Sequence, residues 1–191
     1  MEWIPVFRIG LLNAWIVMIW LIVLPILTNI ITKDKKTSER LRTSVPLKFE
    51  KALNIMSMVV VIFGFMYSIF LPIKYGTIWY YLGGLFFLFG ILLYLYVIVS
   101  IRNASIDKPL TQGPYRFSRH PIYISMFFIF ISIIIMCLSW VFLFLLAFLL
   151  MHFLIVIPAE EQYCLRIYGV EYQDYIERTP RWIGFPKSVK K

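Results

Sequence analysis

Two polar clusters flank the longest apolar stretch of the sequence. The first polar cluster, residues 113–123, reads GPYRFSRHPIY, and the second polar cluster, residues 158–169, reads PAEEQYCLRIYG. The first offers guanidinium groups, one imidazole and tyrosine rings, whereas the second offers two adjacent carboxylates. Together these groups could bind a small anionic or zwitterionic molecule that carries a flat ring. Basic and tyrosine side chains also anchor helices at a membrane surface, so both interpretations remain open.

The first polar cluster contains the start of a helix. Pro121 suits the first helical position, where its missing N–H has no partner to lose, and His120 is then expected near the N-cap. Gly113 and Pro114 form a turn signal just upstream. The free N–H groups of the first helical turn and the helix dipole favour an anionic group nearby.

The second polar cluster begins with two acids, Glu160 and Glu161. They directly follow an uncharged run, and a carboxylate at the edge of the hydrocarbon is costly and therefore a functional candidate. Alternatively, Pro158 opens a new helix whose dipole the acids complement. Adjacent helical residues point about 100° apart. We therefore expect one acid to line a pocket and the other to pair with a base such as Arg119 or Arg166.

The ligand that fits both clusters would offer a carboxylate, hydroxyl or ammonium groups, and a flat ring. A sulfonium would in addition be attracted to tyrosine faces. S-adenosylmethionine meets all these demands, and a nicotinamide dinucleotide meets some of them. The sequence has no Ser–His–Asp set, P-loop, GxGxxG or HExxH motif, and its two cysteines lack metal-like spacing. We expect no metal and no nucleic-acid partner.

The composition indicates which elements must position these residues. Of 191 residues, 61% are hydrophobic and 15% are charged, against about 25% charged in soluble domains. The mean hydropathy is +0.80. The sequence therefore predicts an integral membrane protein. Its uncharged runs cover residues 9–32, 52–73, 75–101 and 121–159.

The last of these runs is too long for one crossing. Its 39 residues would reach about 58 Å as one helix, nearly twice the hydrocarbon core. We expect it to fold back at residues 136–141, with Ser139 as the N-cap of the second arm. The fold class predicted is all-α, with about five transmembrane helices, the last two forming a helical hairpin. A cytoplasmic C-terminal helical segment follows, interrupted at Gly169.

Charge placement predicts the orientation. With five crossings, seventeen Lys and Arg residues fall on one side and two on the other. The positive-inside rule then places the N-terminus outside and the C-terminus in the cytoplasm. Both polar clusters would share the cytoplasmic face. We expect a single membrane domain over 1–191, with three helices in 1–101 and the cofactor-binding half in 102–191.

Several other residues have more ordinary interpretations. Gly83, Gly84 and Gly90 are expected to let helices approach closely. His152 stands alone in the last apolar run and is expected to pack between helices with one hydrogen bond, the alternative being contact with substrate. Tyrosines at 168, 172 and 175 are close to helical spacing, which is typical of core packing more often than of an aromatic lid.

The two clusters resemble a known family. GPYRFSRHPIYIS and the later AEEQYCLRIYGVEYQDYIERTPR are similar to the isoprenylcysteine carboxyl methyltransferase family, which is related to membrane phospholipid N-methyltransferases. The resemblance covers 110–181. It implies an enzyme that binds S-adenosylmethionine on the cytoplasmic side and admits a lipid substrate from the bilayer. The cofactor-binding residues that it implies are Lys108, Leu110, Tyr115, His120, Pro121, Tyr123 and Glu160.

The resemblance leaves the methyl acceptor open. Family members can carry an arginine one turn before the acids, a region that Val156 occupies here. The function expected is methylation of the carboxylate of a prenylated cysteine or a similar lipid-borne acid, with no catalytic residue assigned. Phospholipid N-methylation is the nearest alternative. An NADPH-dependent sterol-type reductase and a non-catalytic membrane scaffold are the others.

Overall fold

The computed structural model describes residues 8–31, 50–105 and 107–187. Most of the polar linker between the first two apolar runs, residues 33–51, lies outside the described residues. The described part is all-helical, with 74% helix and no strand. Its elements are α1 (Trp15–Met18), α2 (Trp20–Ile31), α4 (Glu50–Ile69), α5 (Ile78–Arg102), the 3-10 helix η1 (Gly113–Arg116), α6 (Pro121–Cys137), α7 (Trp140–Tyr168) and α8 (Val170–Arg178).

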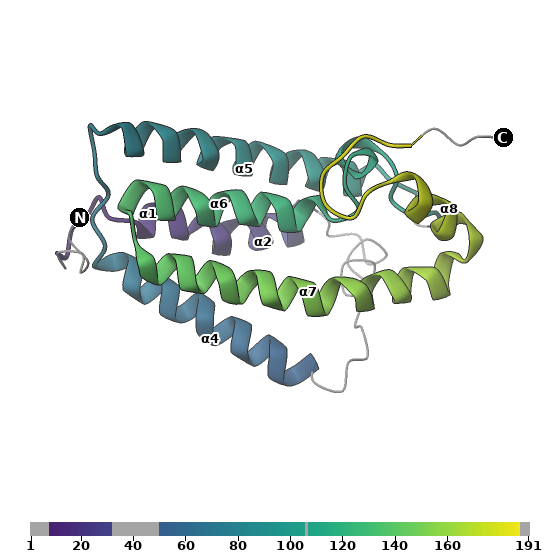
Figure 1. Ribbon diagram of the computed structural model, residues 1–191, viewed down its shortest axis with the longest axis horizontal. Coiled ribbons are helices and arrows are strands. Elements are labelled where there is room, and N and C mark those ends of the chain that lie inside the picture. Colours follow the sequence, from purple (N-terminus) through teal and green to yellow (C-terminus); the bar gives the residue numbers. More distant parts are fainter. Residues whose placement is uncertain (1–7, 32–49, 106, 188–191) are drawn as a thin grey trace.

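Five helical segments run back and forth along the long axis, as Figure 1 shows. They are α1 with α2, then α4, α5, α6 and α7, and they coincide with the predicted apolar runs. Within the described residues, α5 and α7 are long and apolar enough to cross a membrane, whereas the other apolar helices are shorter. The all-helical fold is therefore confirmed, with two candidate membrane-spanning helices. Five crossings and the orientation of the termini stay predictions.

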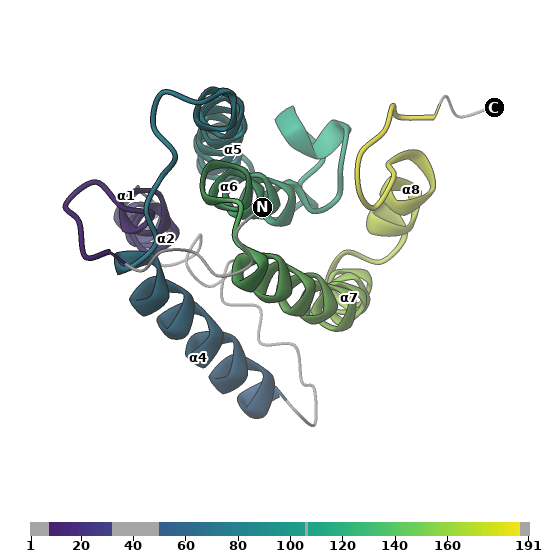
Figure 2. The ribbon, with the colours of Figure 1, turned by 60° about the vertical axis from the view of Figure 1, so that its left-hand side comes forward.

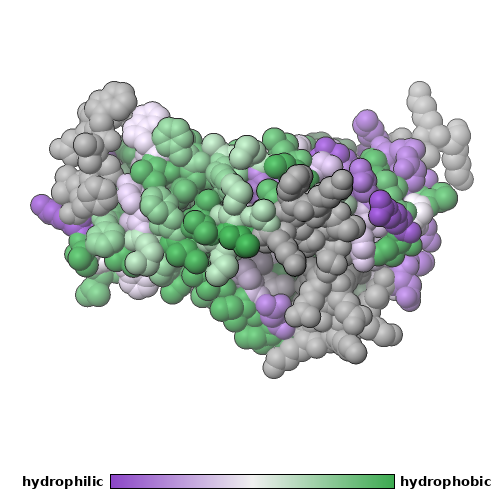
Figure 3. All heavy atoms as spheres, turned by 90° about the horizontal axis from the view of Figure 1, so that it is seen from below, coloured by the Kyte–Doolittle hydropathy of each residue, from purple (hydrophilic) through white to green (hydrophobic). Residues whose placement is uncertain are grey.

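The surface of the molecule has an apolar part and a polar end. Hydrophobic side chains cover much of the face in Figure 3, while hydrophilic ones gather toward the end of the molecule that carries α8. Exposed leucine, isoleucine and phenylalanine side chains are frequent along α4, α5 and α7. Such a belt is favourable against lipid and unfavourable against water.

The last apolar run folds back as predicted. Helix α6 ends at Cys137, and Leu138 adopts a left-handed conformation with φ of 51°. Ser139 is the N-cap of α7, and its hydroxyl accepts the Phe142 N–H at 3.5 Å. The alternative in which Pro158 opens a new helix is wrong, because α7 continues through Pro158 to Tyr168. A turn of two residues, Leu138 and Ser139, thus brings both ends of the run to one end of the bundle.

Helix α7 is longer than a bilayer requires. Its 29 residues extend about 43 Å, against about 30 Å for the hydrocarbon core. The charge-free part ends at Ala159 and accounts for about 30 Å. We therefore take residues 140–159 as the spanning part. Glu160 and Glu161 lie on the part of α7 that projects beyond it.

Helices α5 and α6 pack closely where α5 carries glycine. A Cβ atom at Gly83 would lie 2.5 Å from Met136 Cγ, and one at Gly90 would lie 3.0 Å from the Ser125 carbonyl oxygen. At Gly84 the nearest atom would be 3.8 Å away, an ordinary contact. The expected close approach is confirmed at Gly83 and Gly90, and it is wrong for Gly84. This packing fixes the start of α6 against α5.

The chain returns toward the first polar cluster after α8. Gly169, with φ of 55°, separates α7 from α8, so the predicted break is confirmed. Beyond α8, the Arg119 backbone N–H donates to the Pro180 carbonyl oxygen at 3.1 Å. Figure 2 shows η1, the start of α6, the end of α7, α8 and residues 179–187 around one end of the bundle.

Candidate functional site

The two polar clusters meet through one imidazole. His120 precedes α6, and its Nε2 atom lies 3.1 Å from Glu161 Oε1. Its Nδ1 atom lies 3.6 Å from Glu160 Oε2. The structure thus brings together residues about 40 positions apart, as the hairpin predicted. His120 occupies the N-cap position, but its side chain bridges to α7 and forms no cap hydrogen bond.

Glu161 is the buried acid. Its side chain is 7% exposed and accepts hydrogen bonds from Arg181 Nε at 3.2 Å and Arg181 NH2 at 2.6 Å. Arg119 NH1 lies 3.3 Å from Glu161 Oε1. Burial alone raises the pKa of the Glu161 carboxyl, but the hydrogen bonds from His120 and Arg181 and the Arg119 charge outweigh it and lower the pKa to about 2. Glu161 is therefore ionised at neutral pH.

Glu160 has a different environment. Its side chain is 27% exposed, and the Tyr123 hydroxyl donates to its Oε1 at 2.5 Å. Burial raises the pKa of the Glu160 carboxyl, and the Tyr123 hydrogen bond and the charge of His120 reduce this rise without cancelling it. The nearby charge of Glu161 adds to it. Glu160 therefore takes up a proton at a higher pH than its neighbour.

One part of the expected division between the two acids is confirmed, because Glu161 pairs with a base. Pocket lining by the other acid stays a prediction. Glu161 faces the basic residues, including the predicted partner Arg119, and Glu160 faces Tyr123. An ionised carboxylate only accepts hydrogen bonds, so His120 Nε2 carries the proton between His120 and Glu161. The Nδ1 atom of His120 is then directed to Glu160.

Arg119 has donor groups that the described residues leave unused. Its side chain is 9% exposed, and its Nε and NH1 atoms have no hydrogen-bond partner within the described part of the chain. The contact between NH1 and Glu161 is an ion pair without hydrogen-bond alignment. Buried donors normally have partners. A buried guanidinium with spare donors therefore suits an anionic group of a bound molecule.

The tyrosines of α8 pack into the core. Tyr172 and Tyr175 are buried, and the Tyr175 hydroxyl donates to the Tyr115 carbonyl oxygen at 2.7 Å. Burial is also the main cause that raises the pKa of both hydroxyls. The core-packing interpretation is confirmed for both residues. Tyr175 also lines the pocket described below, so the lid alternative stays a prediction. These contacts attach α8 to η1, directly upstream of His120.

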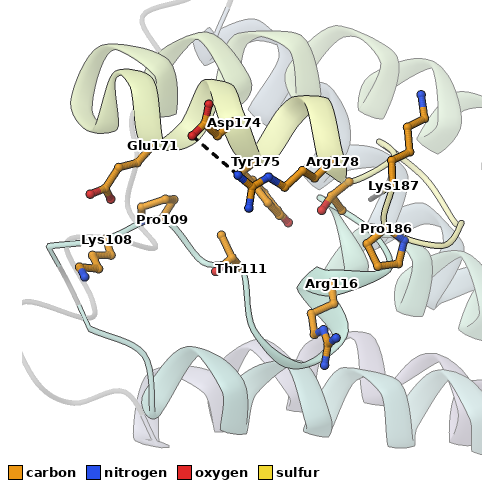
Figure 4. A pocket seen from close by; sticks show the side chains of 11 residues that line it. Lys108, Pro109, Thr111, Arg116, Glu171, Asp174, Tyr175, Arg178, Pro186 and Lys187 are labelled. Carbon is orange, nitrogen blue, oxygen red and sulfur yellow. Dashed lines mark ion pairs between the residues drawn. The ribbon is translucent and has the colours of Figure 1, made fainter. Parts of the chain in front are cut away.

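A pocket of about 430 Å³ lies between the loop before η1, η1 itself, α8 and the segment that follows α8 (Figure 4). Lys108, from the loop before η1, is at its edge, together with three further basic residues. The Asp174–Arg178 ion pair, at 4.0 Å, runs along α8 at one wall of the pocket. Its lining residues are Lys108, Pro109, Thr111, Arg116, Glu171, Asp174, Tyr175, Arg178, Thr179, Pro186 and Lys187.

The predicted cofactor residues are therefore not all in one place. His120, Tyr123 and Glu160 contact one another, and Pro121 begins the helix that carries Tyr123. Tyr115 is buried against α8, and Leu110 packs against the hydrophobic core. Lys108 lines the pocket, whose lining includes neither His120 nor Glu160. Cofactor binding by all seven remains a prediction.

The sequence reasoning missed Arg181. This residue forms the shortest contact to Glu161, yet in the sequence it only follows the proline that ends α8. The only indication in the sequence was the excess of basic residues in the C-terminal tail, and this excess did not show that Arg181 pairs with Glu161. His152, in contrast, behaves as expected: its Nδ1 atom lies 3.0 Å from Ser57 Oγ, between α7 and α4.

The comparison with known families covers both polar clusters. Residues 54–171 match the family model described as phospholipid methyltransferase, which is more than half of the chain. No curated protein matches the sequence at a significant level. The matched region begins within α4 and ends in the first turn of α8, so it includes His120, Glu160 and Glu161 and stops before Arg181.

Proposed function

The chain belongs to the phospholipid methyltransferase family, and we propose that it transfers a methyl group to a lipid-borne acceptor at the α8 end of its helical bundle. Methyltransferases of this family normally use S-adenosylmethionine. The observation that carries the proposal is the bridge by which His120 joins Glu160 and Glu161. We further propose that this end faces the cytoplasm, because it carries most of the basic residues that the structure describes.

The side chains present fit S-adenosylmethionine. The spare donors of Arg119 suit its carboxylate, and the partly exposed Glu160 suits its ammonium or ribose hydroxyl groups. The Tyr123 ring offers a face to a cation. When bound, the cofactor supplies an electrophilic methyl group on a positively charged sulfur.

The protein contributes orientation and charge. Glu161, held ionised by Arg119 and Arg181, fixes the His120 ring, and His120 in turn faces Glu160. Glu160, with its raised pKa, holds a proton at a higher pH than an ordinary glutamate does. Bringing acceptor and donor together at a largely water-excluded helix end supplies much of the rate acceleration that methyl transfer needs.

The first candidate acceptor is the carboxylate of a prenylated cysteine or a similar lipid-borne acid. The resemblance of both clusters to the carboxyl methyltransferases supports it. A carboxylate is already ionised near neutral pH, so this reaction requires no base. The side chains of the cluster would then act only by binding and alignment.

The second candidate acceptor is the amine of a phospholipid headgroup. The description of the matched family supports it, and so does one feature of the site. An ammonium group must lose a proton before it can be methylated. The Glu160–His120 pair, backed by ionised Glu161, provides a place for that proton.

Calorimetric titration of the detergent-solubilised protein tests the class of enzyme. We expect S-adenosylhomocysteine to bind and the Glu160→Gln and His120→Ala variants to bind it at least tenfold more weakly. Glu177→Gln, which removes an exposed acid of α8, is the matched control and should bind as the wild type does. Binding of NADPH alone would indicate a reductase, and binding of neither ligand would indicate a scaffold.

Methyl transfer from radiolabelled S-adenosylmethionine then identifies the acceptor. Prenylcysteine analogues and phosphatidylethanolamine are offered separately to the same preparation. A product whose label is released by base is a methyl ester and supports the carboxylate. A base-stable product on phosphatidylethanolamine supports the amine.

A further inference from the structure

The segment after α8, residues 179–187, folds back onto the first polar cluster. We call it the returning segment. The Ser118 hydroxyl donates to the Arg181 carbonyl oxygen at 3.2 Å, and the Gly184 N–H donates to the Phe117 carbonyl oxygen at 3.0 Å. At its far end, the Lys187 N–H donates to the Arg178 carbonyl oxygen at 2.8 Å. The segment is thus held at several points, and Arg181 lies between them.

Arg181 contacts Glu161 through two donors on one edge of its guanidinium group. Nε donates to Oε1 and NH2 donates to Oε2, at 3.2 and 2.6 Å. A two-point contact fixes the plane of a carboxylate, which a single point charge does not. Glu161 in turn raises the pKa of Arg181, so this pair is charged across the accessible pH range.

The oxygen that Arg181 Nε contacts is also the oxygen that His120 uses. Glu161 Oε1 lies 3.1 Å from His120 Nε2 and 3.3 Å from Arg119 NH1. The orientation of the carboxylate therefore decides whether this oxygen serves the imidazole. Without Arg181, the carboxylate is free to turn toward Arg119, which is buried and has spare donors. His120 would then lose the acceptor that keeps the proton on Nε2.

We propose that Arg181 is a positioning residue of the methyl-transfer site, which holds Glu161 in the orientation that fixes His120 between the two glutamates. The proposal rests on the proposed function and goes beyond it, because Arg181 lies outside the residues that match the family. It acts on the reaction through Glu161 and His120. The returning segment is thereby part of the site.

The groups that face Glu161 give the direction of the expected pH effect. They are Arg119 and His120 at the start of α6, Glu160 on α7, Tyr172 and Tyr175 on α8, and Arg181. Removing the Arg181 hydrogen bond raises the pKa of the Glu161 carboxyl. The acidic limb of the activity profile should therefore move to higher pH.

The decisive variants are Arg181→Gln and Arg181→Lys. Methyl transfer to whichever acceptor the assay above identifies is followed from pH 5 to 9, and S-adenosylhomocysteine affinity is measured in parallel. We expect Arg181→Gln to lower kcat about tenfold, with a smaller change in KM and in affinity. Arg181→Lys should recover part of kcat, because it restores charge and one contact. The control Arg166→Gln removes an exposed arginine of α7 that does not line the pocket, and it should match the wild type.

A second measurement reports which nitrogen of the His120 imidazole carries the proton, and it does not depend on enzyme activity. The chain has two histidines, so the nitrogen-15 NMR spectrum of histidine-labelled protein is simple, and His152 is an internal control. We expect a protonated Nε2 on His120 in the wild type and mixed tautomers in Arg181→Gln, with the His152 signals unchanged. Should no methyl transfer be found, this spectrum still tests the role of Arg181.

Two results would overturn the proposal. The first is an Arg181→Gln protein with the wild-type kcat, pH profile and His120 signals. The second comes from the double variant with Glu161→Gln: losses that multiply would show that Arg181 acts independently of Glu161. If Arg181→Gln does not fold, the comparison is made between Arg181→Lys and the wild type, where unchanged kcat and His120 signals are equally decisive.

Discussion

Two adjacent glutamates acquire different properties because α7 directs them to different partners. Glu161 faces two arginines and an imidazole, whereas Glu160 faces a tyrosine hydroxyl and one edge of the same imidazole. The pKa of the Glu161 carboxyl is lowered, and that of the Glu160 carboxyl is raised. Pairs of acids whose surroundings separate their pKa values are typical of sites that bind and move protons.

The pKa of Glu161 predicts how stability depends on pH. The folded value of about 2 is below the ordinary value of 4.5, so ionised Glu161 stabilises the fold above about pH 4.5, and this contribution is lost as the pH falls toward 2. We expect it to be on the order of 2 kcal/mol. Tryptophan fluorescence during thermal unfolding in detergent, from pH 6 to 3, should show a steeper loss in the wild type than in Glu161→Gln.

The comparison isolates Glu161 because Glu160 is present in both proteins. The raised pKa of Glu160 has the opposite effect on stability, and it contributes to both curves. At pH 7 the variant should already be less stable, since Arg119 loses its buried counter-charge. Parallel curves for the two proteins would show that Glu161 is not the group that titrates.

At the scale of elements, the close packing of α5 on α6 positions His120. The glycines that permit this packing provide a matched pair of variants. Gly83→Ala introduces a methyl group 2.5 Å from Met136 Cγ and 2.9 Å from the Ser132 carbonyl oxygen, whereas Gly84→Ala meets only an ordinary contact. Both substitutions have the same gain in helix propensity, which cancels in the comparison.

We expect Gly83→Ala to be less stable than Gly84→Ala by about 1–3 kcal/mol, the usual cost of overpacking. Chemical denaturation in mixed micelles, followed by far-ultraviolet circular dichroism, measures the difference. Equal stability of the two variants would mean that Met136 moves aside at little cost. Met136 lies near the end of α6 that is distant from His120, so Gly83→Ala tests the helix packing without touching the site.

At the scale of the whole molecule, the site exists only if the hairpin brings both clusters to one side of the membrane. Single cysteines replacing Arg116 and Arg178 should react with an impermeant thiol reagent from the same side, and one replacing Lys74 from the opposite side. All three positions are exposed. The background should lack Cys164, and Cys137 is buried.

Lys74 is the appropriate contrast because it lies at the hairpin turn. Its N–H donates to the Met136 carbonyl oxygen at 3.1 Å, close to the residues that join α6 and α7. Labelling of positions 116 and 178 from opposite sides would contradict the shared site. Reaction of these two from the outer side of inverted vesicles would support the cytoplasmic placement.

The sequence by itself determined the features that depend on neighbouring residues. The length of the apolar run, the proline before Ile122 and the serine before Trp140 were sufficient to place α6, the turn and the start of α7. From these the meeting of the two clusters followed, because both ends of a helical hairpin lie at the same end of the bundle. Helix period, capping and hydrophobic length are local, and they can be read along the chain.

Only the tertiary structure decided which acid faces which partner and where the tail goes. Glu161 and Arg181 are separated by a helix end, α8 and a proline, and their contact depends on the hydrogen bonds that attach the returning segment to Phe117, Ser118 and Arg119. The burial of Tyr175 depends likewise on the backbone of η1. Such contacts join distant segments, so their free energy depends on the whole arrangement and leaves no periodic pattern in the sequence.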